Sequence, residues 1–126
     1  MPSARIFHIA FAEDWARGRA AGAYRAASLY SEGFIHGSEA HQVIEVANRL
    51  FRGIRGLVLL HIDVSRVGAE IRHENLEGGE ALFPHIYGAI PVAAVVAAVA
   101  FEPAADGSFD HHAGLGTLEA RSSTVR

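Results

Sequence analysis

Three short apolar segments, each with one histidine inside it, constrain this chain most. They are residues 6–10 (IFHIA), residues 33–38 (GFIHGS) and residues 83–88 (FPHIYG). The second has the form of a short strand that leads into a helix, with His36 at the strand end and Ser38 suited to cap the helix. Because each segment carries its histidine in a similar setting, we expect His8, His36 and His85 to converge on one cleft.

The composition excludes several classes of protein. The chain has 126 residues, only 11 of them Lys or Arg, and a net charge of -3 with histidine neutral. A broad nucleic-acid-binding face is therefore not expected, although a narrow site for one or two phosphates stays open. The chain has no cysteine, which excludes disulfides, thiolate nucleophiles and cysteine-based zinc sites.

No targeting or membrane segment is expected. The N-terminus lacks a basic stretch followed by an apolar one. The most apolar run, residues 90–101, is shorter than the roughly 20 residues that cross a bilayer. This run is interpreted as a buried element, and a cytoplasmic location is expected.

Strands are predicted where apolar and β-branched residues cluster, in residues 5–11, 34–37, 57–64, 69–74 and 95–102. One helix is predicted over residues 13–21, because two carboxylates begin it and Gly22 follows it. A second is predicted from Ser38, because apolar residues recur at helical spacing up to Phe51. Residues 24–31 show no clean period and are predicted to form a loop that carries Arg25.

Short strands with two helices in the N-terminal half predict an α+β fold rather than an alternating parallel one. We expect one small domain over residues 1–103, with a curved, split, mainly antiparallel sheet and two main helices. Residues 104–126 are polar, rich in Gly and Ser and without a period, so a flexible C-terminal tail is expected. The chain has no glycine-rich dinucleotide-binding or phosphate-loop motif.

Two histidines and one glutamate are the candidate catalytic residues. His36 and His85 can accept or donate a proton near neutral pH, although each can equally pack in the core or brace a turn. Glu74 ends a strand before a turn, where it can enter a cleft or face solvent.

Four further residues are candidates for binding a ligand. Ser38, Tyr87 and Arg25 supply a hydroxyl, a phenol and a cation. His8 lies within a strand, so it either lines the site or is a core histidine bonded to the backbone. The chain has no HxH, HxxxH or HExxH spacing, so no metal site is expected, and no GxSxG motif for a serine triad.

In their order along the chain, these segments resemble the bacterial family known as domain of unknown function 952. The combination of residues 33–36 (GFIH) with residues 83–88 (FPHIYG) carries the resemblance, which covers residues 5–103. That family is in turn similar, more distantly, to the ADP-ribosyltransferase-like fold, which includes the tRNA 2′-phosphotransferases.

The resemblance implies roles for individual residues. In those enzymes a histidine on the first core strand contacts the NAD ribose, and His8 matches that position. A motif at a later strand end matches His36, and a glutamate that polarises the ribose hydroxyl or the nucleophile is matched by Glu74. The phosphotransferase branch uses arginines for the RNA phosphate, for which Arg25 and Arg72 are the candidates.

The leading hypothesis is an NAD- or nucleotide-handling transferase of ADP-ribosyltransferase-like type, with a cleft formed by His8, His36, His85 and Tyr87. NAD is the expected cofactor, and no metal is expected. Cleaving the nicotinamide–ribose bond develops positive charge on the sugar, and each ~1.4 kcal/mol by which a fixed carboxylate stabilises it is tenfold in rate.

Two alternatives stay open: a non-catalytic module that binds a nucleotide or small anion, and a small hydrolase with a histidine as general base. The expected partner is a small-molecule nucleotide. A membrane is not an expected partner, and a nucleic acid is disfavoured without being excluded. The sequence does not indicate an oligomeric state.

Overall fold

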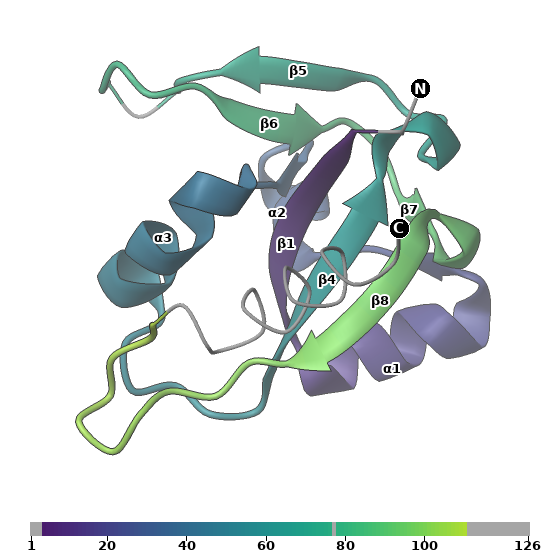
Figure 1. Cartoon of the computed structure of the whole chain (residues 1–126). Helices are drawn as coiled ribbons and strands as arrows, with labels where there is room; N and C mark the ends of the chain where they lie inside the picture. Colours follow the sequence, from purple (N-terminus) through teal and green to yellow (C-terminus); the bar gives the residue numbers. More distant parts are fainter. Residues whose placement is uncertain (1–3, 77, 111–126) are drawn as a thin grey trace, which may run out of the picture.

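A computed structural model describes residues 4–76 and 78–110 of the chain (Figure 1). In chain order its elements are β1 (Arg5–Phe11), α1 (Ala12–Ala21), β2 (Ala23–Tyr24), α2 (Ala27–Ser31), β3 (Ile35–His36), η1 (Ala40–Gln42), α3 (Val43–Leu50), β4 (Leu57–Asp63), η2 (Val64–Arg66), β5 (Ile71–Glu74), β6 (Phe83–Ile86), β7 (Ile90–Pro91), η3 (Val92–Ala94) and β8 (Val95–Ala100), where η marks a 3-10 helix.

The strands form three antiparallel sheets. The order in the largest is β1-β4-β8, β3-β6-β5 make a second sheet, and β2 pairs with β7 in a third. In Figure 1 the β5–β6 hairpin crosses one end of β1 and β4, while α1 and α3 lie on different sides of the largest sheet. The prediction of a small α+β domain with a split antiparallel sheet and two main helices is confirmed. Its ADP-ribosyltransferase-like character stays a prediction.

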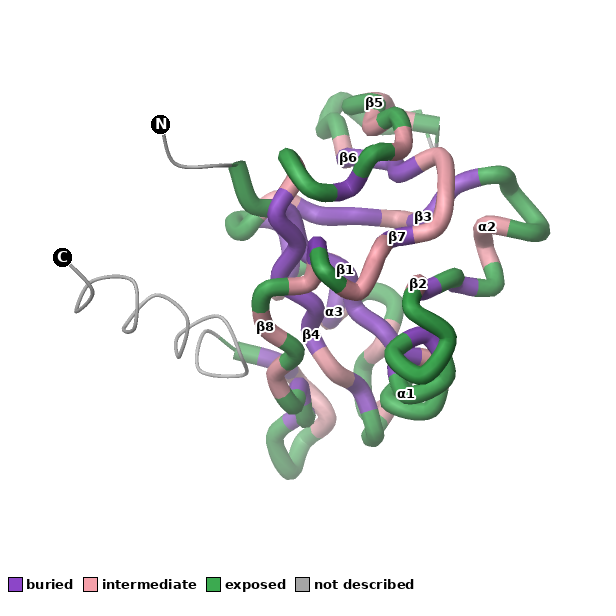
Figure 2. The backbone as a smooth tube through the Cα atoms, turned by 90° about the vertical axis from the view of Figure 1, so that its right-hand side faces the viewer, coloured by how far each residue is buried: buried purple, intermediate pink, exposed green. Residues whose placement is uncertain are grey.

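Alternation along the strands explains how one sheet supports two hydrophobic clusters. Successive side chains of a strand point to opposite faces. In β4, Leu60 and Ile62 therefore join the cluster that contains Trp15 of α1, whereas Leu57 and Leu59 join the cluster beneath α3. Strands β1 and β4 are mostly buried while the outer surface of α1 is exposed, as Figure 2 shows. The central sheet is thus a rigid base for the residues that extend from its edge.

Several predicted boundaries are confirmed. The strand predicted over residues 5–11 is present with these bounds, and the strand predicted over residues 69–74 is present over residues 71–74. Strands β4, β6 and β8 fall within predicted apolar segments. Gly22 ends α1 with φ +91°, a left-handed conformation that glycine adopts without steric cost.

The prediction of a loop over residues 24–31 is wrong. Tyr24 pairs with Ile90 between β2 and β7 and is 2% exposed, and residues 27–31 form α2. The Ser28 hydroxyl donates a hydrogen bond to the carbonyl of Phe34 at 2.8 Å. The partner of Tyr24 lies far along the chain, which is why local periodicity did not reveal this pairing.

The prediction that Ser38 caps a helix is also wrong. Ser38 forms an isolated antiparallel bridge with Phe7, and both backbone hydrogen bonds between them measure 2.8 Å. Helical structure begins at Ala40. The N–H of the preceding residue, Glu39, donates a hydrogen bond to the side chain of Gln42 at 2.9 Å. The N-cap is therefore Glu39, one residue later than predicted, and the Ser38 side chain does not cap the helix.

The expected domain boundary at residue 103 also differs from the structure. Phe109 is 3% exposed and stacks on Phe101, with ring centroids 4.8 Å apart. The backbone of Phe109 exchanges two hydrogen bonds with the Asn48 side chain, at 2.8 and 3.0 Å. Residues 104–110 therefore pack onto α3 as part of the domain. The rest of the predicted tail, residues 111–126 with both its histidines, lies outside the described residues.

Among the described residues, no helix combines the length and the apolar character needed to cross a membrane.

Candidate functional site

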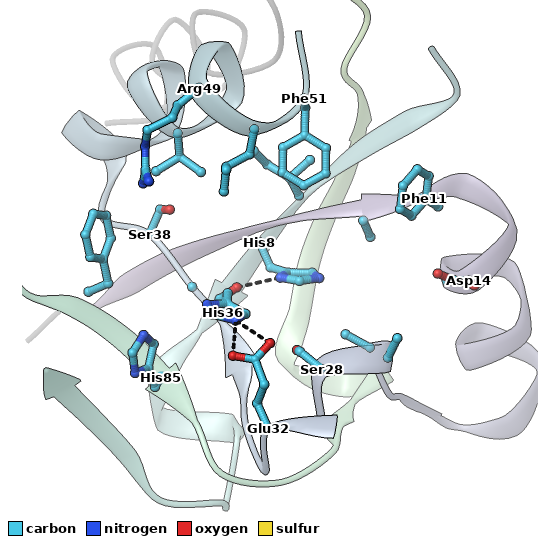
Figure 3. A pocket seen from close by; sticks show the side chains of 18 of the residues that line it. His8, Phe11, Asp14, Ser28, Glu32, His36, Ser38, Arg49, Phe51 and His85 are labelled. Atoms are coloured by element: carbon cyan, nitrogen blue, oxygen red, sulfur yellow. Dashed lines mark hydrogen bonds and ion pairs between the residues drawn. The ribbon is translucent and has the colours of Figure 1, made fainter. Parts of the chain in front are cut away.

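A cavity of about 410 Å³ opens between the largest sheet, α2, α3 and the β3–β6 pair. His8 of β1, His36 of β3 and His85 of β6 all line it, so the structure brings together the three histidines that the sequence pattern groups (Figure 3). Volumes of 300–1,000 Å³, roughly, are usual for small-molecule sites. The cavity therefore has room for a ligand of mononucleotide size.

Most of the remaining wall is apolar. Six of the apolar lining residues are Ile9, Phe11, Val46, Leu50, Phe51 and Phe83. Phe11 and Leu50 are 45% and 56% exposed, and the rings of Phe11 and Phe51 meet edge to face at 6.3 Å. Exposed apolar side chains at a cavity rim are typical of ligand sites, because a ligand can bury them.

His8 is held in one neutral tautomer. Its Nδ1 lies 2.6 Å from the carbonyl oxygen of His36, so Nδ1 carries the hydrogen and donates it. Its Nε2 lies 2.8 Å from the Tyr24 hydroxyl and accepts from it. Burial lowers the pKa of His8 from 6.5 to about 4, against the opposing effect of the His36 carbonyl. Burial also raises the pKa of Tyr24, with a smaller contribution from Asp14, so the phenol keeps its proton.

His8 therefore acts in this structure as a fixed part of the cavity wall. Both ring nitrogens form hydrogen bonds with protein groups, as expected for a histidine that is part of the core. A role in contacting a ribose stays a prediction.

His36 and His85 are cross-strand partners that both line the cavity. They face each other in the β3–β6 register, and their rings lie 5.4 Å apart in an edge-to-face arrangement. Phe34 contacts both rings and stacks on His85 with centroids 4.1 Å apart. Nε2 of His36 lies 3.2 Å from Glu32 of the segment after α2, and this pair is well exposed.

His85 is paired with a carboxylate behind the cavity wall. Its Nδ1 lies 3.0 Å from Oε1 of Glu74, and the same oxygen accepts a hydrogen bond from the Tyr87 hydroxyl. The hydrogen bonds from Tyr87 and, to a smaller extent, His85 hold the pKa of Glu74 below its ordinary value. The His85 side chain is 4% exposed and that of Glu74 is 23% exposed. The carboxylate is therefore ionised, and it fixes the hydrogen of His85 on Nδ1.

Four of the predicted site residues, namely Glu74, Tyr87, Arg25 and Arg72, are not among the described residues that line the cavity. Glu74 and Tyr87 reach it only through His85. Tyr87 also carries Arg72 over its ring at 4.5 Å. Arg25 is exposed and outside the lining. Ser38 does line it.

Sequence reasoning missed the charged residues that do line the cavity, namely Arg49, Glu32 and Asp14. Arg49 lies on α3 beside the apolar face that the sequence revealed, so its place on the helix was predictable once that face was known. Glu32 and Asp14 carried no comparable signal. Their positions depend on how α1 and α2 pack around the cavity.

The fold and the site define a class: a small α+β domain with split antiparallel sheets and a histidine-lined cavity at their junction. The chain belongs to the family described as Protein of unknown function (DUF952), whose match spans residues 9–98. No curated protein matches the sequence.

Solved structures of a similar protein support this assignment. The crystal structure of protein CC0527 from Caulobacter crescentus is 32% identical in sequence, with a TM-score of 0.76. The match covers 86% of this chain and 95% of that protein. Its solution NMR structure gives a TM-score of 0.74 at the same identity, covering 85% of this chain and 92% of the other.

Proposed function

We propose that this chain is an enzyme that binds a nucleotide-sized small molecule in the cavity and uses His85 to transfer a proton. One observation carries the proposal. Nδ1 of His85 is paired at 3.0 Å with Glu74, which lies behind the wall, while the His85 ring itself lines the cavity. No hydrogen bond within residues 4–76 and 78–110 involves Nε2 of His85, so this nitrogen is available to a ligand.

A histidine held in this way suits acid–base chemistry. The carboxylate keeps one tautomer, so that Nε2 presents a lone pair, and it stabilises the imidazolium that forms when Nε2 takes a proton. A positioned acid or base contributes about 10²- to 10⁴-fold in rate. Tyr87 strengthens the arrangement because its hydroxyl binds the same carboxylate oxygen.

His36 is the second group for proton transfer in this proposal. Its pairing with Glu32 at 3.2 Å repeats the histidine–carboxylate pattern on the neighbouring strand. Because the two rings lie 5.4 Å apart, one imidazole can hold a proton while the other accepts one from the same ligand.

The family resemblance suggests one specific enzyme of this kind, a transferase that acts on NAD. In such an enzyme Glu74 acts through His85 and does not touch the ribose. The carboxylates that line the cavity are those of Glu32 and Asp14, and they would face positive charge that develops on the sugar. The absence of a metal in the reaction stays a prediction.

The test compares wild type with His85→Gln. Both are incubated with NAD and with nucleoside monophosphates, while nicotinamide release and other products are followed by chromatography. We expect turnover by wild type, a loss of about 10²-fold or more in His85→Gln, and retention of binding. His73→Gln is the matched control, because His73 is exposed, pairs with Glu39 and does not line the cavity.

Two results would oppose the proposal. Equal turnover by wild type and His85→Gln would remove His85 from the chemistry. Stabilisation by a ligand without any conversion, about 2.7 kcal/mol at a hundredfold excess over Kd, would favour the non-catalytic binding module instead. Conversion by water alone would identify the small hydrolase.

A further inference from the structure

The Ser38 hydroxyl is a second polar group that the cavity leaves available. Ser38 is 6% exposed and lines the cavity. Within the described part of the chain its hydrogen bonds are those of its backbone with Phe7, and none involves the hydroxyl. A nearly buried hydroxyl without a protein partner costs free energy unless water or a ligand completes its hydrogen bonds.

Arg49 brings a positive charge to the same part of the wall. It extends from α3 into the cavity lining, and Figure 3 shows its guanidinium group directed toward Ser38. A guanidinium group next to a hydroxyl donor suits a tetrahedral or planar anion, because both can donate to its oxygens.

The backbone on both sides of Ser38 is held by hydrogen bonds, which fixes where its side chain begins. Its bridge to Phe7 uses both of its backbone groups at 2.8 Å. The preceding Gly37 donates to the carbonyl of Pro84 at 2.8 Å, and a Cβ at Gly37 would lie only 2.8 Å from that oxygen. Glycine is therefore required for this close approach, and the backbone position of the serine that follows it is set before a ligand arrives.

We propose that Ser38 and Arg49 form an anion subsite that binds the phosphate of a phosphate monoester. The proposal rests on the proposed function only in taking the cavity as a ligand site. Val46 and Leu50 of α3 and the adjoining Phe51 line the cavity along with Arg49, and their apolar surface receives the uncharged part of the ligand.

The opposite side of the cavity carries the opposite charge. Asp14 and Glu32 lie across the cavity from Arg49 in Figure 3. Carboxylates there repel a second anionic group. The ligand is therefore anionic at one end only, and its other end is uncharged or cationic.

The experiment measures the binding of AMP and of adenosine by calorimetry in wild type, Arg49→Gln and Ser38→Ala. In wild type we expect AMP to bind about 10- to 100-fold more tightly than adenosine. Arg49→Gln should remove most of this preference while the affinity for adenosine stays the same. Ser38→Ala should reduce it by about fivefold or more, and inorganic phosphate should compete with AMP but not with adenosine.

Arg52→Gln is the matched control, because Arg52 is an exposed arginine next to α3 that does not line the cavity. It should leave the preference for AMP unchanged. Thermal unfolding of each variant confirms that the fold is kept.

Three results would overturn the proposal: equal affinities of wild type for AMP and adenosine, equal losses in Arg49→Gln and Arg52→Gln, or no binding of either AMP or phosphate at millimolar concentration. A preference for AMP without any chemical conversion would leave the subsite standing while the role of His85 in catalysis fails. The two proposals are thus tested separately.

Discussion

Nδ1 of His85, which lines the cavity, lies 3.0 Å from Oε1 of Glu74, which does not. His85 belongs to β6 and Glu74 ends the neighbouring β5. In the antiparallel register Glu74 lies opposite Phe83, two residues before His85, so Glu74 and His85 are diagonal neighbours on one face of the sheet. The histidine side chain is nearly buried while the carboxylate is partly exposed. The sheet therefore holds the imidazole from behind and leaves its other nitrogen to the cavity.

Tyr87→Phe should raise the pKa of Glu74 toward its ordinary value. The Tyr87 hydroxyl makes the largest contribution to the lowered pKa, ahead of His85. A carboxyl pKa that is lower in the folded state stabilises the fold above the unfolded pKa, and this stabilisation is lost as pH falls through the folded pKa. The variant should therefore lose less stability than wild type on acidification.

Carboxyl carbon NMR titration measures this pKa directly. Tyr30→Phe is the control, because Tyr30 is 76% exposed and does not contribute to the lowered pKa of Glu74. An unchanged Glu74 titration in Tyr87→Phe would show that the hydrogen bond is absent in solution.

The stability of the fold should depend on pH through His8. Its pKa is about 4 in the folded state and near 6.5 when unfolded. Between these values the unfolded chain binds a proton that the folded chain does not, so the free energy of unfolding falls as pH drops from 6.5 to about 4. The full effect is roughly 3 kcal/mol.

Urea unfolding at a series of pH values, in wild type and His8→Gln, tests this. Glutamine offers a donor and an acceptor but does not titrate. The free energy of unfolding of His8→Gln should therefore vary less with pH across this window than that of wild type, by the amount due to His8. Identical pH profiles would mean that His8 is not the group responsible.

Phe109→Ala should lower the free energy of unfolding by about 3–5 kcal/mol, because it empties a buried aromatic site. Chemical denaturation measures the loss. The exposed Leu82→Ala is a suitable control and should cost no more than about 0.5 kcal/mol. If both substitutions cost equally little, residues 104–110 do not pack as described.

Much of the fold could be predicted from the local spacing of apolar residues in the sequence. Strands β1 and β4 are continuous apolar segments, and α3 carries one apolar face, so their hydrophobic spacing predicted them. The loop assigned to residues 24–31 failed because Tyr24 is ordered by Ile90, a partner far along the chain. The assignment of Ser38 as a cap failed for a related reason: its backbone is used by Phe7.

Part of the candidate site could also be predicted from the sequence. The histidines were found because each stands in an otherwise apolar strand, where a polar side chain is conspicuous. The partners of His8 and His36 were not identified, because Tyr24 lies in the segment assigned as a loop and Glu32 follows it. Glu74, the partner of His85, was among the candidates. Arg25 was preferred over Arg49 because sequence alone does not show which cation faces the cavity.

The most direct test of the central claim is the NMR spectrum of the histidine ring nitrogens at mildly alkaline pH, with and without AMP or NAD. We expect His85 to carry its hydrogen on Nδ1 in wild type and to lose this preference in Glu74→Gln. We also expect a nucleotide to shift Nε2 of His85 and to leave His73, outside the cavity, unchanged. A hydrogen on Nε2 of His85, or an Nε2 signal that no nucleotide shifts, would show that His85 is not the proton-transfer group of this cavity.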